Sequence, residues 1–431
     1  MDWAFPWYIG AAFFVAIAGG FLLAMLLPLA VLEGWDWGLR WEPLVQAHGH
    51  LQTLGWLGLF LIGMADRLIP RFAGRPLRFA RVTPVALVLL LAGLLGRTAA
   101  QPWLDRPGLH EVLVVSAFAE LLGAVLFAGA VLLTLAPALR TLPVAPLFLL
   151  GALGLLGQAV LGAIWLPVLT PDSPVIAPVR DSVLLGLQFY AFILPFVLGV
   201  SLRALPAFFK HRAPATAEVW VLSGLLLLGS LFYAGSALWG GGSAQAGFES
   251  IGALLLAVAM LGAALETGIW RKPEGLRVSA RHAVLLIRSA YIWMLLAAAL
   301  LAIGGASALL THQPAPPYLA DAVRHMLALG MFSTMIAGMA QLLFPSLAQR
   351  RLKSRDAIMQ TWVLWSLFML AVTLRASGAL LEGVGADGER YWLITAGGVA
   401  GISAVGFLGA TILRSTRRQS GVLPLHEADR P

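Results

Sequence analysis

Cysteine is absent from the 431 residues of this chain, and charged side chains are scarce. The absence of cysteine excludes disulfides and thiolate metal sites, and it leaves histidine as the only strong nitrogen ligand for a metal or a haem. Asp, Glu, Lys and Arg make up 12% of the residues, about half of the share in soluble domains. Because 59% of the residues are hydrophobic and the mean hydropathy is +0.85, an ordinary soluble domain is excluded.

Several familiar motifs are also missing from the sequence. It contains no phosphate loop, no dinucleotide-binding fingerprint and no hydrolase motif. The first apolar run begins near residue 7 without a basic region before it or a small-residue cleavage site behind it, which favours a retained span over a signal peptide. The net charge of +8 would suggest nucleic acid for a soluble protein, but membrane topology explains it here, and we expect no nucleic-acid partner.

Long apolar runs dominate what remains, and each is about 20 residues or longer, enough to cross about 30 Å of hydrocarbon as a helix. Helices are required because lipid cannot satisfy open backbone groups. The sequence therefore predicts an all-α membrane protein in the lipid bilayer. The twelve transmembrane helices are expected at about 7–31, 45–69, 83–102, 111–136, 143–168, 182–205, 217–238, 250–270, 283–310, 323–344, 357–381 and 391–414.

The loops between these spans alternate in charge. The second loop carries Arg71, Arg75, Arg78 and Arg81, and every even-numbered loop is basic, whereas the odd-numbered loops are acidic or nearly uncharged. Basic loops stay on the cytoplasmic side. We therefore expect a multi-pass protein of the bacterial inner (cytoplasmic) membrane with both termini in the cytoplasm, including a tail at 415–431.

One stretch, 47–72, recurs twice in register, at 184–209 and 323–347. Counted back from Pro70, Pro206 and Pro345, three glycines lie 7 residues upstream, and 20 residues upstream lie a histidine, a glycine and a histidine. These six positions are Gly63, Gly199, Gly338, His50, Gly186 and His325. A fixed period predicts repeated units. We expect one membrane domain over 1–431, built from three pseudo-repeated four-helix arcs at about 1–140, 141–278 and 279–418.

Histidines near the outer ends of spans 2 and 10 are the candidate ligands. His50 and His325 share the repeat register, and helices related in this way can face each other across a bundle, which suits bis-imidazole ligation of a haem. His48 and His50 lie about 200° apart around a helix, so they cannot point to the same place. The apolar face of His50 resembles that of His325, so the internal register favours His50. A histidine there could also lie at the headgroup interface.

Other polar residues in the spans have candidate roles. Arg97 and Arg375 lie near the outer ends of spans 3 and 11 and could pair with haem propionates, or could reach the interface as isolated cations. Gln52 and Gln188 match in register and could support the ligands or only bond helices together. Glu120, inside span 4, could serve a proton path, a cation or only a hydrogen bond.

Twelve spans in three arcs with histidines on spans 2 and 10 resemble the catalytic subunit I of haem-copper oxidases. His48-Gly49, with Gly63 and Pro70 further along, is similar to the second span of that superfamily, and this comparison favours His48 as the low-spin haem ligand. Span 6 offers Gln188 and Tyr190 where the superfamily has a histidine, span 7 has no histidine, and span 10 has only His325. A dinuclear centre that reduces oxygen or nitric oxide is therefore not expected, and we leave open whether the chain is an enzyme.

A closer resemblance is to the NnrS family, membrane proteins of twelve spans that bind haem and copper and are linked to nitric oxide and nitrosative stress. The residues that carry it are His48-Gly49-His50, then Arg203, Pro206 and Phe208 of span 6, and His325 with Gly330 of span 10. The chain has Leu51-Gln52 instead of the family's Glu-Met, and Gln349-Arg350-Arg351 instead of a basic motif with histidine. Copper binding is therefore doubtful, and we expect b-type haem.

The resemblance implies a haem-binding membrane protein in the nitric oxide response, or in haem or electron handling, with a redox partner or nitric oxide as its counterpart. The alternatives are a secondary transporter without haem and a divergent nitric oxide or oxygen reductase. A three-fold repeat argues against the transporter, because such folds usually have inverted or two-fold repeats.

Overall fold

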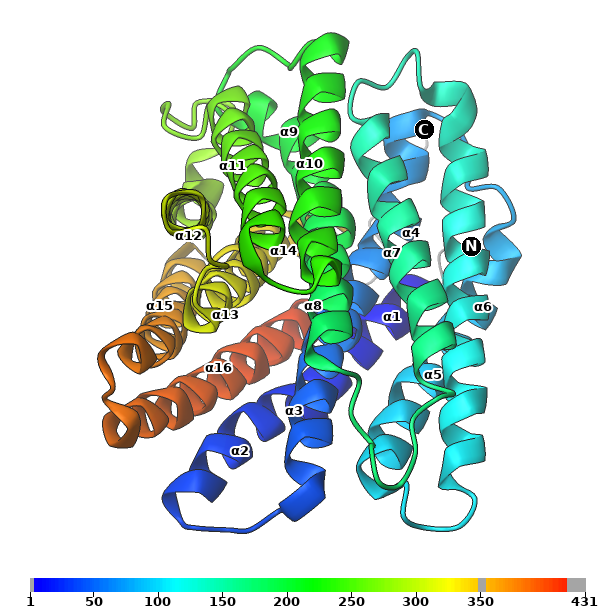
Figure 1. The fold of residues 1–431 in the computed structure, drawn as a ribbon. Coiled ribbons are helices and arrows are strands. Elements are labelled where there is room, and N and C mark those ends of the chain that lie inside the picture. Colours follow the sequence, from blue (N-terminus) through cyan, green and yellow to red (C-terminus); the bar gives the residue numbers. More distant parts are fainter. Residues whose placement is uncertain (1–3, 348–353, 417–431) are drawn as a thin grey trace, which may run out of the picture.

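The computed structural model describes residues 4–347 and 354–416, and Figure 1 shows the helices that these residues form. Within these residues the chain is all-helical without a β-strand, and twelve helical segments are long and apolar enough to span a membrane. The predicted fold class and number of spans are thus confirmed. The motif Gln349-Arg350-Arg351 and most of the tail at 415–431 lie outside the described residues.

The twelve spans consist of α-helices extended or interrupted by short π and 3₁₀ segments. Spans 1–4 contain α1 (Ala4–Val15), η1 (Ala16–Phe21) and α2 (Leu22–Leu32); η2 (Gly38–Arg40), α3 (Trp41–His50), η3 (Leu51–Gly58) and α4 (Leu59–Ala73); η4 (Ala80–Val82), α5 (Thr83–Ala100) and η5 (Gln101–Trp103); and α6 (Leu109–Leu135) with η6 (Ala136–Ala138). Spans 5–8 contain α7 (Ala145–Trp165); α8 (Pro178–Gly186), η7 (Leu187–Ile193) and α9 (Leu194–Phe208); α10 (Thr216–Ser236) with η8 (Ala237–Trp239); and α11 (Gly242–Glu266). Spans 9–12 contain η9 (Val278–Ala283) and α12 (Val284–Thr311); α13 (Pro317–His325), η10 (Met326–Ser333) and α14 (Thr334–Leu347); α15 (Ser354–Leu381) with η11 (Glu382–Val384); and α16 (Asp387–Thr416).

Several spans begin earlier than hydropathy predicts. Span 2 starts at Gly38 instead of residue 45, and span 10 starts at Pro317 instead of residue 323. Hydropathy detects only the apolar part of a span, and the first turns of these two spans contain polar residues. Their backbone hydrogen bonds nevertheless continue the helix. The loops after α2, α5 and α7 lie together at the bottom of Figure 1, and the loop after α9 lies at the top.

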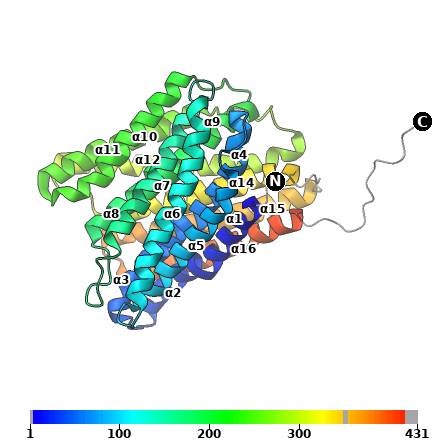
Figure 2. The ribbon, with the colours of Figure 1, turned by 90° about the vertical axis from the view of Figure 1, so that its right-hand side faces the viewer.

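The spans form an outer ring around three inner helices. Spans 1, 3, 4, 5, 7, 8, 9, 11 and 12 each contact the next around a closed ring, and α5, α6 and α7 lie side by side in Figure 2. Spans 2, 6 and 10 fill the centre, because 83%, 83% and 72% of their central windows are buried, against at most 56% in any other span. The three stretches that recur in the sequence are therefore the inner helices.

Each inner helix changes to π winding at the same repeat position. The residues that precede η3, η7 and η10 are His50, Gly186 and His325. π turns are rare and often mark functional sites. The three segments meet at the centre, where Trp56 of η3 donates to Ser333 of η10 (3.0 Å) and Phe189 of η7 lies 6.2 Å, between ring centroids, from Phe332 of η10.

The repeated glycines allow each inner helix to approach the span before it. A Cβ atom at Gly63 would lie 2.6 Å from Tyr8, one at Gly199 would lie 2.9 Å from Phe148, and one at Gly338 would lie 2.8 Å from Ile287. Real Cβ atoms do not pack so closely, so only glycine fits these contacts. This recurrence supports the three arcs, whose arrangement stays a prediction.

Candidate functional site

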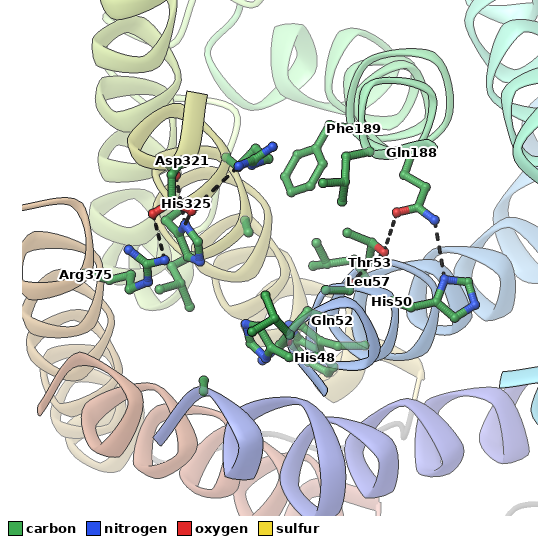
Figure 3. Close-up of a pocket in the computed structure, with 18 of the residues that line it drawn as sticks. His48, His50, Gln52, Thr53, Leu57, Gln188, Phe189, Asp321, His325 and Arg375 are labelled. Carbon is green, nitrogen blue, oxygen red and sulfur yellow. Dashed lines mark hydrogen bonds and ion pairs between the residues drawn. The ribbon is translucent and has the colours of Figure 1, made fainter. Parts of the chain in front are cut away.

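A cavity of about 240 Å³ lies at the end of the bundle where the odd-numbered loops meet, between the inner helices and spans 1, 3, 11 and 12 (Figure 3). Much of its wall is apolar, but ionisable side chains cluster in it. They are His48, His50, His325, Arg97, Arg324, Arg375, Asp181 and Asp321. Gln52 and Gln188 also border the cavity, so all seven site residues predicted from the sequence lie around one space.

His48 is held by span 1. Its Nδ1 lies 2.9 Å from the carbonyl oxygen of Gly20 in η1, and since a carbonyl can only accept, Nδ1 carries the proton. In the neutral ring Nε2 is then the nitrogen with the free lone pair. No hydrogen bond of Nε2 occurs among the described residues, so this atom is available as a ligand.

His325 is oriented in the same way from the opposite helix. Its Nδ1 donates to the carbonyl oxygen of Asp321, one turn earlier in α13, at 2.8 Å. Within the described part of the chain, Nε2 of His325 has no hydrogen-bond partner either. Two imidazoles therefore border one cavity with Nδ1 fixed by a carbonyl, which is the arrangement that prepares a histidine to bind a metal through Nε2.

Asp321 joins His325 to the arginines of the cavity. Its Oδ2 lies 2.8 Å from Nη2 of Arg375 in α15, and its Oδ1 lies 3.2 Å from Nδ1 of His325 and 3.8 Å from Nη2 of Arg324. Nη1 of Arg375 is buried and makes no hydrogen bond to any described residue. A buried donor without an acceptor is costly, so the site has capacity for an anionic group that is not part of the chain.

His50 projects from the other side of its helix, away from His48 (Figure 3). Its Nε2 donates to Oε2 of Glu120 (2.8 Å), and its Nδ1 accepts from Nε2 of Gln188 (3.4 Å). Both ring nitrogens are thus engaged, and only 3% of the residue is exposed. The internal register favours His50 as the ligand, but this geometry favours His48, as the oxidase comparison does.

The hydrogen bonds around His50 form a closed buried ring. Gln158 of α7 donates to Oε1 of Glu120 (3.2 Å) and accepts from Gln188 (3.1 Å), while Thr53 donates to Oε1 of Gln188 (2.7 Å). Spans 2, 4, 5 and 6 each contribute at least one member. Gln188 is therefore a link of this ring, whereas Gln52 packs against Gly20, where a Cβ atom would lie 3.0 Å from its Cδ.

Arg97 of α5 is held by a chain of polar side chains at its own end of the span. Its Nε donates to Oε1 of Gln101 (3.1 Å), and Gln101 donates in turn to Gln46 (2.8 Å) and to the carbonyl of Pro174 (3.1 Å). Only 4% of Arg97 is exposed. The side chain is therefore held inside the bundle and does not extend to the interface.

The sequence did not predict four polar members of the cavity and of the buried ring, Asp321, Arg324, Asp181 and Gln158. The three charged residues are near span ends and read as loop or interface residues, and Gln158 is a lone amide in an apolar run. One signal was present, because Asp321 lies four residues before His325, the spacing at which side chains meet on a helix.

The middle repeat has no ligand at the corresponding place. A Cβ atom at Gly186 would lie 2.6 Å from Cβ of Ala234, so this position is filled by close helix packing with span 7. No group of three or more His, Asp or Glu side chains that could hold a metal ion occurs among the described residues. That finding concerns free metal ions, because a haem iron needs only axial ligands from the chain.

Comparison with known proteins identifies the family. The family model described as NnrS protein matches residues 12–417, a range that begins within span 1 and includes spans 2 to 12. No curated protein matches the chain. Because the match extends over nearly the whole sequence and includes every residue of the cavity described above, the chain belongs to the NnrS family.

Proposed function

We propose that this membrane protein binds one b-type haem in the cavity, where His48 and His325 would hold the iron. The observation that carries the proposal is the pair of imidazoles that border one cavity, each with Nδ1–H bonded to a backbone carbonyl and Nε2 without a partner among the described residues. His50 is not a ligand in this proposal, because Glu120 and Gln188 occupy its ring nitrogens.

The charges around the cavity fit the carboxylates of a haem. Arg97, Arg324 and Arg375 border it, and Arg375 has a buried Nη1 without an acceptor in the described structure. Guanidinium groups bind carboxylates through paired hydrogen bonds. We therefore assign Arg375 and Arg97 to the propionates, and Gln52, which lines the wall beside His48, to packing against the macrocycle.

The size of the cavity sets a condition on this assignment. Pockets for drug-sized ligands measure roughly 300–1,000 Å³, and the cavity measures about 240 Å³. A haem exceeds that volume, so we expect apolar side chains of the wall, such as Leu185 and Leu329, to move apart when it binds.

Haem supplies one-electron chemistry or the binding of a diatomic gas. The residues of the chain orient the ligands, hold the propionates and keep water from the apolar wall. His48 and His325 would hold the haem, which would supply electron transfer or a binding site for a gas such as nitric oxide. We therefore propose a role in the response to nitric oxide and nitrosative stress, or in haem or electron handling, with a redox partner or nitric oxide as the counterpart.

The proposed orientation follows from the basic even-numbered loops. Both termini would lie in the cytoplasm of a bacterial inner membrane, and the cavity would lie near the outer face. The ionisable residues of the cavity then lie close to the interface, where their desolvation costs less than at the bilayer centre.

The optical spectrum of purified protein tests this proposal and separates the two neighbouring histidines. We expect a Soret band of low-spin haem that is lost or shifted in His48→Ala and in His325→Ala. Added imidazole should restore it in part, since it can replace the missing ligand. His50→Ala should keep the band if the protein folds, and His312→Asn, in an outer loop, is the control. A band that survives in His48→Ala and is lost only in His50→Ala would refute the assignment.

A further inference from the structure

We infer that Asp321 is a positioning residue that lowers the reduction potential of the iron bound by His325. This inference rests on the proposed haem site and adds to it a residue that regulates the site. The juxtaposition that carries it is one carboxylate held between the Nδ1 of His325 and the guanidinium of Arg375.

The Nδ1–H of His325 faces two acceptors from the same residue. The Nδ1–H donates to the carbonyl oxygen of Asp321 at 2.8 Å, and the carboxylate Oδ1 of the same residue lies 3.2 Å from Nδ1, so a negative charge lies directly beside the donated proton. Both contacts arise because Asp321 precedes His325 by one turn of α13. The side chain of Asp321 cannot leave easily, because Arg375 of α15 holds Oδ2 at 2.8 Å.

The second proposed ligand has no such partner. The Nδ1–H of His48 donates to the carbonyl of Gly20 at 2.9 Å, and no carboxylate bonds this ring among the described residues. Asp181, the other acid of the cavity, makes no bond to either ligand histidine in the described structure. The site is therefore asymmetric, because a carboxylate contacts the ring of only one of the two proposed ligands in the described structure.

A carboxylate at the far nitrogen makes an imidazole a stronger electron donor to the metal. A stronger donor stabilises the oxidised iron more than the reduced iron, and hydrogen bonding to the ligands is among the means by which proteins set haem potentials. Arg375 opposes this effect, since its charge draws electron density from the carboxylate. Removing the charge of Asp321 and removing the charge of Arg375 should therefore shift the reduction potential in opposite directions.

The test is the midpoint potential of the purified full-length holoprotein, measured by mediated optical titration of its haem band. Asp321→Asn keeps the shape and removes the charge, and it should raise the potential. Arg375→Gln leaves the carboxylate on His325 without its counter-charge, and it should lower the potential. Asp181→Asn is the matched control, because it removes an acid from the same cavity without touching His325, and its shift should be smaller than that of Asp321→Asn.

A merely structural role for Asp321 predicts a different pattern. Loss of packing would move Asp321→Asn and Arg375→Gln in the same direction, and that result would overturn the inference, as would equal shifts in Asp321→Asn and Asp181→Asn. Failure of Asp321→Asn to hold haem would also overturn the inference, because Asp321 would then be needed for haem retention and not for setting the potential. Arg375→Gln is interpreted only together with Asp321→Asn, since Arg375 is also assigned to a propionate. A wild-type protein without any haem band refutes the proposed function, whereas a band with unchanged potentials refutes only this inference.

Discussion

At the scale of single residues, the two histidines of the motif His48-Gly49-His50 have different hydrogen-bond partners. His48 and His50 both belong to α3 and leave it on opposite sides, so His48 reaches span 1 while His50 reaches span 4. Glu120 decides the second orientation, because its carboxylate accepts from Nε2 of His50 inside an apolar bundle. The buried ring therefore fixes the rotation of span 2 about its axis, and with it the position of His48.

Removing one member of that ring tests its contribution to stability. Glu120→Ala leaves Nε2 of His50 and Nε2 of Gln158 without acceptors, and each unsatisfied buried group costs about 1–3 kcal/mol. Glu120→Gln retains an acceptor oxygen and should lose less. We expect a clearly lower unfolding free energy for Glu120→Ala in reversible detergent unfolding. Equal stability of the two variants would show that the ring does not hold the helices together.

The residues around the cavity were predictable from the sequence, but their hydrogen-bond partners were not. His48, His325, Arg97 and Arg375 stand out because polar groups are rare in apolar spans. Their hydrogen bonds to Gly20, Asp321 and Gln101 depend on helix rotation and on contacts with other spans, which periodicity does not encode.

At the scale of elements, the inner helices were predictable as a set and their winding was not. The repeated glycines and prolines mark spans 2, 6 and 10 because close helix contacts require small residues at fixed places. The π segments η3, η7 and η10 begin at the repeat position, but Leu51–Gly58 has no local signal that distinguishes it from an α-helix. Its winding depends on tertiary contacts between the three inner helices.

Two glycines of α7 test the close approach of span 5 to η7. A Cβ atom at Gly154 would lie 2.3 Å from the carbonyl oxygen of Ala191, whereas one at Gly162 would meet nothing within 4 Å. Overpacking costs about 1–3 kcal/mol, and alanine in a helix gains about 0.5–1 kcal/mol over glycine. We expect Gly154→Ala to destabilise the protein and Gly162→Ala to be neutral or stabilising in thermal unfolding. A stable Gly154→Ala would contradict the contact between α7 and η7.

For the whole molecule, hydropathy and period predicted twelve spans because the bilayer imposes both length and backbone satisfaction on each helix. The ring of nine spans around three, as seen in the described residues, follows less directly. This arrangement depends on which helix faces are lined with small residues. Such faces can be recognised in the sequence only for the three repeated stretches.

The absence of cysteine provides a direct test of orientation. Single-cysteine variants can be labelled without a background, so Asp172→Cys in the loop after span 5 and Arg75→Cys in the loop after span 2 report opposite faces. In intact spheroplasts, a membrane-impermeant maleimide should label Asp172→Cys and reach Arg75→Cys only after permeabilisation. The reverse pattern would invert the proposed topology and put the cavity on the cytoplasmic side.

The central claim is that one cavity of this bundle holds a haem between His48 and His325. The measurement that tests it most directly is the haem content of protein purified from haem-supplemented cells, alongside the double variant His48→Ala/His325→Ala. We predict about one haem per chain in the wild type and almost none in a double variant that remains folded. A folded wild-type protein without haem, or a double variant that retains it in full, would contradict the account.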